Sequence, residues 1–111
     1  MEFNEYQKRA VTTAVYPQEF AVPYLTLGLA GEAAEVANKV KKIIRGDYDN
    51  NPEEMNKVKS AISKECGDVL WYLAVLVDEL GVEFNEVAQS NLDKLAARKD
   101  SGTLKGSGDD R

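Results

Sequence analysis

The chain has 111 residues, of which 43% are hydrophobic, and it carries 19 acidic against 14 basic side chains, for a net charge of −5. A chain of this length forms one domain with a small core, so association with a second copy would help to bury apolar surface. The negative charge argues against a nucleic-acid polymer as partner, because binding along a phosphate backbone needs a basic surface.

The chain contains one cysteine and no histidine. A single cysteine excludes an internal disulfide, and the first ten residues lack the apolar run of a signal peptide, so we predict a cytoplasmic protein. No uncharged span approaches transmembrane length, which argues against a membrane partner. The absence of histidine removes His-based zinc sites and Ser-His or Cys-His nucleophiles, so any hydrolysis must rely on carboxylates and a metal ion.

Capping and breaking residues predict an all-α fold of about four helices. A first helix should begin with an N-cap at Asn4 and end before Pro17. A long helix should begin near Pro23 or Thr26 and end near Gly46, which suits a left-handed C-terminal cap. We expect one helical domain over residues 1–100.

A second long helix should follow a short loop. Asn51 is placed to cap this helix, Pro52 falls in its first turn, and Gly81 should stop it after Leu80. A final helix is predicted over residues 82–99, with its apolar face toward the core. The last eleven residues, 101–111, are rich in Gly and Ser and predict a disordered tail, although they could instead order over a bound ligand with Lys105 on a phosphate.

Two pairs of acidic residues flank the apolar seams of the two long helices. Glu32 and Glu35 lie three residues apart on the first of these helices, and Glu65 and Asp68 repeat the arrangement in the same phase on the second. A short loop makes the helices antiparallel, and about thirteen residues, roughly 20 Å, separate each pair from the loop. The four carboxylates should therefore meet at the same level.

Four ionised carboxylates within a few ångströms repel one another, which either proton uptake or a multivalent cation would relieve. We favour the cation, because hard oxygen ligands without imidazole or thiolate suit Mg²⁺ or Mn²⁺. The predicted metal ligands are Glu32, Glu35, Glu65 and Asp68. One acidic pair alone would be ordinary on a solvated helix face, with Glu35 paired to Lys39, whereas two pairs in matched phase are much less expected by chance.

Three further features are open to two interpretations. Asn91, Lys94 and Arg98 form a polar stripe that could bind phosphate, although cations also favour a helix C-terminus through its dipole. The aromatic pair Trp71 and Tyr72 favours a core or subunit interface over base stacking. Glycines at positions 28 and 31 allow either close helix packing or room for a ligand.

Four stretches of this sequence also carry a family resemblance. They are GLAGEAAEVANKVKK at residues 28–42, KECGDVLWYL at residues 64–73, NLDKLAAR at residues 91–98 and the ending GTLKGSGDDR. With a Glu-x-x-Glu on one helix and a Glu-x-x-Asp on the next, the chain resembles the MazG-like nucleoside triphosphate pyrophosphohydrolases, a branch of the all-α NTP pyrophosphatases. The resemblance covers nearly the whole chain.

The resemblance implies a helical bundle that assembles as a homodimer or as a homotetramer, a dimer of dimers. It implies Mg²⁺, with Mn²⁺ as a substitute, on four catalytic carboxylates, and hydrolysis of (deoxy)nucleoside triphosphates to monophosphates and pyrophosphate. The metal-binding and catalytic residues implied are Glu32, Glu35, Glu65 and Asp68, and the substrate-binding residues are Lys39, Asn91, Lys94 and Arg98. Attack at the α-phosphorus is likewise implied by the family.

Two alternatives remain open from the sequence. Related folds cleave dUTP, dCTP or phosphoribosyl-ATP, and neither base nor sugar preference can be read from these residues. A non-catalytic helical interaction module would instead use the apolar seams to bind a partner helix and leave its acidic side chains in solvent.

Overall fold

The computed structural model describes residues 1–111 and contains four α-helices, one short 3-10 helix and no strands. In chain order the elements are α1 (Phe3–Val11), η1 (Gln18–Phe20), α2 (Ala21–Arg45), α3 (Pro52–Glu79) and α4 (Phe84–Ser101). The all-α prediction is confirmed. No helix combines the length and the apolar character that crossing a membrane requires.

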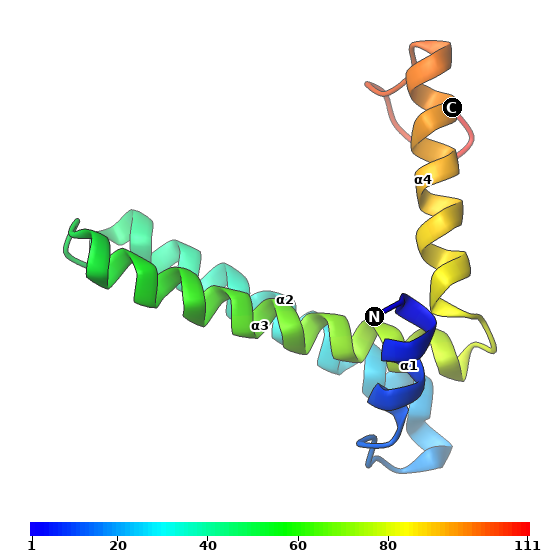
Figure 1. Ribbon diagram of the computed structural model, residues 1–111, viewed down its shortest axis with the longest axis horizontal. Coiled ribbons are helices and arrows are strands. Elements are labelled where there is room, and N and C mark those ends of the chain that lie inside the picture. Colours follow the sequence, from blue (N-terminus) through cyan, green and yellow to red (C-terminus); the bar gives the residue numbers. More distant parts are fainter.

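The long helices α2 and α3 form an antiparallel hairpin (Figure 1). Gly46 ends α2 in the left-handed conformation, at φ 84°, and its N–H donates to the carbonyl of Ile43 over 3.1 Å. Asn51 caps α3, because its side-chain oxygen accepts the backbone N–H of Glu54 over 2.8 Å, and Pro52 opens the first turn. These contacts confirm the predicted positions of both caps and of the loop between them.

The core lies where α1 packs against the end of this hairpin. Leu25 and Ala74 are fully buried, and Val75 is 1% exposed. The side chain of Gln7 runs through the core, donating to the carbonyls of Ala74 and Val82 over 3.2 and 3.1 Å and accepting the N–H of Phe84 over 3.0 Å. One buried amide therefore ties α1 to α3, to the loop after α3 and to the start of α4.

The start of α1 differs from the prediction. The helix begins at Phe3, with Glu2 in the N-cap position and no side-chain cap. Asn4, the predicted cap of this helix, instead accepts the N–H of Asn85 over 2.8 Å, while the Asn85 side chain accepts the N–H of Asn4 over 3.0 Å. Each asparagine side chain thus accepts a backbone N–H from the first turn of the other helix. This reciprocal pair joins the N-termini of α1 and α4.

Helix α4 contacts α1 and α3 near its beginning and then projects away from the hairpin without touching α2 (Figure 1). Phe84 is buried at its start, whereas Leu92 and Leu95 are 61% and 41% exposed. The prediction that the apolar face of this helix lies toward the core is therefore wrong beyond its first turns within one chain.

The tail after α4 also differs from the expected disorder. Gly102 ends the helix in the left-handed conformation, at φ 73°, and the N–H of Thr103 donates to the carbonyl of Arg98 over 2.8 Å. The chain then folds back along the last turns of α4, where Asp109 lies 3.2 Å from Lys94.

The extended shape of this chain gives it more accessible surface than a compact domain of the same mass. The radius of gyration is 17.3 Å, against about 13 Å for a compact domain of this length. The accessible surface is 7998 Å² for 12.3 kDa, which exceeds the roughly 6,100 Å² typical of that mass by about 1,900 Å². Only ten of the 111 residues are buried, so one copy leaves much of its apolar surface in contact with solvent.

Replacing Gln7 tests the buried amide. Gln7→Ala leaves the N–H of Phe84 and the carbonyl of Val82 without their partner and removes a second bond to the carbonyl of Ala74, so we expect the free energy of unfolding in urea to fall by about 2 kcal/mol or more. The control Gln89→Ala removes an exposed side chain bonded only to Asp93 and should change stability by less than about 0.5 kcal/mol. Equal effects of the two substitutions would contradict this role for Gln7.

Candidate metal centre

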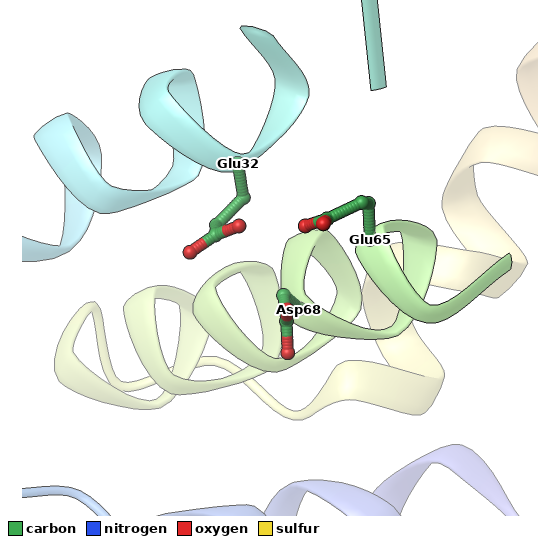
Figure 2. Close-up of side chains that lie close together, drawn as sticks. All are labelled: Glu32, Glu65 and Asp68. Atoms are coloured by element: carbon green, nitrogen blue, oxygen red, sulfur yellow. The ribbon is translucent and has the colours of Figure 1, made fainter. Parts of the chain in front are cut away.

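Three acidic side chains converge across the hairpin. Glu32 extends from α2 toward Glu65 of α3, and Asp68 lies one turn further along α3 (Figure 2). One carboxylate oxygen from each residue lies within 4.8 Å of the other two. The helices therefore bring three of the four predicted ligands together, at the level expected from their distances to the loop.

The charges of this cluster act on one another. Partial burial of Glu32 raises the pKa of its carboxyl, and the nearby carboxylates of Asp68 and Glu65 raise it further. Because the folded state then holds the Glu32 proton more tightly than the unfolded state, the metal-free protein loses stability as the pH rises through the titration range of Glu32. At neutral pH the cluster is a concentration of negative charge that a cation would stabilise.

Glu35, the fourth predicted ligand, lies outside this group. Its side chain is exposed, although its charge is close enough to contribute to the raised pKa of Glu32. The structure thus separates Glu35 from the three convergent carboxylates while leaving it one turn along the same helix.

Lys39 is the cation of this region. Its ammonium group lies 3.5 Å from a carboxylate oxygen of Glu65, and the two side chains are 29% and 21% exposed. A pair between Lys39 and Glu35 on one helix is the alternative for an ordinary solvated face, whereas the observed ion pair crosses the hairpin from α2 to α3. Lys39 therefore stands beside the acidic cluster, where an incoming phosphate group could compete for it.

The aromatic ring of Tyr72 explains one of the two glycines in α2. A Cβ atom added at Gly28 would lie 2.1 Å from the ring of Tyr72, whereas one added at Gly31 would meet no atom within 4 Å. Gly28 is thus a packing position, and Gly31 faces open space. Burial raises the pKa of the Tyr72 hydroxyl, and the nearby side chains of Tyr24 and Glu32 raise it further. Tyr72 therefore lies close enough to Glu32 to feel its charge.

The predicted substrate residues of α4 are separate from the acidic cluster within one chain. Asn91 is exposed, Lys94 pairs with Asp109, and Arg98 is 7% exposed beneath the tail. Because α4 does not contact α2 and points away from the hairpin (Figure 1), these residues do not line the site formed by Glu32. Sequence spacing alone contained no signal for this separation.

Comparison with known proteins identifies the family. Residues 21–103 match the model of the MazG nucleotide pyrophosphohydrolase domain. The chain belongs to the MazG family. It is 44% identical to the gene 37 protein of Mycobacterium phage L5 over the full length of both chains. It is 32% identical to the uncharacterized protein YvdC of Bacillus subtilis, over 68% of this chain and 74% of that protein. No solved structure gives a significant match.

Membership of the MazG family assigns the chain to the nucleotide pyrophosphohydrolases, whose substrates are small nucleotides. The family is metal-dependent in general. The donor set of Glu32, Glu65 and Asp68 fits that property, because it offers only carboxylate oxygens, which bind hard divalent cations.

Thermal unfolding tests whether the acidic cluster binds Mg²⁺. At free Mg²⁺ of 100 times Kd, we expect stabilisation of about 2.7 kcal/mol and a rise in Tm. Glu32→Gln should raise the Tm of the metal-free protein, because it removes repulsion within the cluster, and should abolish most of the Mg²⁺-induced rise. The control Glu53→Gln alters an exposed carboxylate paired with Lys57 and should keep that rise. A metal-induced shift of the same size in Glu32→Gln would contradict the proposed ligand.

Proposed function

We propose that this MazG-family protein hydrolyses (deoxy)nucleoside triphosphates to monophosphates and pyrophosphate in the cytoplasm, with Mg²⁺ as cofactor and Mn²⁺ as a substitute. The observation that supports the proposal most is the convergence of Glu32, Glu65 and Asp68 within 4.8 Å of one another, in a chain whose family acts on nucleotides. Glu35 is the proposed fourth acidic residue of the site.

The roles of the residues follow from their chemistry. Glu32, Glu65 and Asp68 would hold Mg²⁺, which when bound neutralises charge on the leaving pyrophosphate and lowers the pKa of an attacking water. With no histidine in the chain, a carboxylate oxygen of the site accepts the proton of that water. Lys39 exchanges its contact with Glu65 for a phosphate oxygen and so helps to orient the triphosphate.

Product analysis tests the reaction. Purified protein is incubated with Mg²⁺ and each (d)NTP, including dUTP and dCTP, and separately with phosphoribosyl-ATP. We expect the (d)NTPs to release pyrophosphate and the monophosphate, whereas turnover of dUTP, dCTP or phosphoribosyl-ATP alone would favour the alternative activities of related folds. Asp68→Asn should lower kcat by about 10²–10³-fold, because it removes a preorganised charge from the reacting centre, whereas Glu53→Gln should leave kcat unchanged. Release of orthophosphate and a diphosphate would contradict attack at the α-phosphorus. No turnover together with no metal-induced thermal shift would favour a helical interaction module.

The chain's surface supports assembly with a second copy. An excess of about 1,900 Å² over a compact domain of this mass falls within the roughly 1,000–2,500 Å² that each partner of an obligate homodimer buries. Exposed apolar side chains lie on α2 and on α4, the helices that do not touch within one chain. They include Leu27, Val40, Ile44, Leu92 and Leu95. We propose a homodimer or a dimer of dimers.

Such an assembly would also complete the active site. The acidic cluster lies on the hairpin of one chain, whereas Asn91, Lys94 and Arg98 lie on a helix that points away from it. A partner's α4 packed against the hairpin would supply the phosphate-binding residues that the cluster lacks. The proposed site is therefore shared between two subunits.

Mixing two inactive variants tests the shared site. Glu65→Gln and Lys94→Ala should each be inactive alone, yet a mixed dimer retains one site with an intact cluster and an intact α4, so random exchange should restore about a quarter of wild-type activity. Activity is followed as pyrophosphate release after subunit exchange, and light scattering gives the oligomeric state. A monomer in solution, or no recovery in a confirmed mixed dimer, would contradict a site shared in this way.

A further inference from the structure

The tail after α4 is a closed loop held by its last residue. Arg111 donates to three carbonyls of its own segment, those of Thr103, Leu104 and Gly108, over 3.0, 3.2 and 2.6 Å. Gly106 permits the close approach of this arginine, because an added Cβ would lie 3.0 Å from the Cδ of Arg111. These internal contacts hold the loop closed.

This loop places a carboxylate on two cations of α4. One oxygen of Asp109, Oδ1, lies 3.2 Å from Nζ of Lys94 and 3.2 Å from Nη2 of Arg98. The same Nη2 donates to the backbone carbonyls of Gly108 and Asp109 over 3.3 and 3.1 Å. The hydrogen bonds from Lys94 and Arg98 lower the pKa of Asp109, so its carboxyl stays ionised at neutral pH.

The tail satisfies only part of the hydrogen-bonding capacity of Arg98. The side chain is 8% exposed, and its buried Nε has no hydrogen-bond partner, which is an unfavourable state for a charged donor. The Nε and Nη2 groups of a guanidinium form a fork that a phosphate or carboxylate can bind with two oxygens. The tail occupies one arm of this fork and leaves the other empty.

We propose that residues 103–111 are an autoinhibitory latch, in which Asp109 occupies the anion site of Lys94 and Arg98 until phosphate groups of the nucleotide displace it. The inference deepens the proposed function, on which it rests for the identity of the displacing ligand. A phosphate group carries more oxygens and more charge than Asp109, so it can engage both arms of the Arg98 fork together with Lys94. Binding then requires the tail to leave the helix.

The first test measures binding of inorganic pyrophosphate by calorimetry without metal. Asp109→Asn removes the competing charge from both cations, so we expect Kd to fall about fivefold, the scale of exposed ion pairs. The matched control is Asp110→Asn, which removes the same charge from the next residue, whose side chain makes no hydrogen bond or ion pair in the structure. Its Kd should stay within about twofold of the wild-type value. Equal changes in the two variants, weaker binding by Asp109→Asn, or no binding by any form would overturn the latch.

The second test follows the tail itself by hydrogen exchange. Saturating pyrophosphate should accelerate exchange over residues 103–111 of the wild-type protein, because the latch opens when phosphate takes its place. Unchanged or slower exchange would overturn the proposal, and slower exchange would show instead that the tail closes over the ligand. Neither experiment involves turnover. A protein that hydrolyses no nucleotide can therefore still show the latch. Conversely, if the enzyme is active but Asp109→Asn and Asp110→Asn bind pyrophosphate with the same Kd, the latch is contradicted and the proposed function is not.

Discussion

The antiparallel register of α2 and α3 determines whether the acidic cluster exists at all. Glu32 lies thirteen residues before the end of α2, and Glu65 lies thirteen residues after the start of α3. Caps at Gly46 and Asn51 fix both ends of the loop, so the two carboxylates reach the same level. A slip of one residue would move a side chain by about 1.5 Å along the axis and about 100° around it, enough to turn it away from the cluster.

That register concentrates negative charge at a place where the charge does not stabilise the fold. Partial burial raises the pKa of Glu32, and the charges of Asp68 and Glu65 raise it further, while the ammonium group of Lys39 pairs only with Glu65. Stability of the fold comes from elsewhere, from the core around Leu25 and the buried amide of Gln7. Because the stabilising contacts lie apart from the acidic cluster, the carboxylates can be positioned for a cation without disturbing the packing of the helices.

Local rules predicted the hairpin well and the rest of the chain less well. The caps at Gly46 and Asn51 depend only on neighbouring residues, so their positions and the convergence of Glu32 with the acids of α3 could be read from spacing. The direction of α4 could not, because an apolar face such as that of Leu95 does not specify whether it packs on its own chain or on another. The reciprocal bonds of Asn4 with Asn85, more than eighty residues away, likewise have no local signal.

The tail shows why composition is a weak guide to order in a segment tied down by charge. Residues 102–111 have no hydrophobic periodicity, yet Arg98 and Asp109 hold them against α4 through hydrogen bonds to backbone and side chain, and Arg111 closes the loop on itself. Contacts of this kind are ionic and partly exposed, so they are individually weak and open to competition by a stronger anion. A helix that projects from its own core and carries cations covered by its own tail is consistent with the shared phosphate-binding site that we propose.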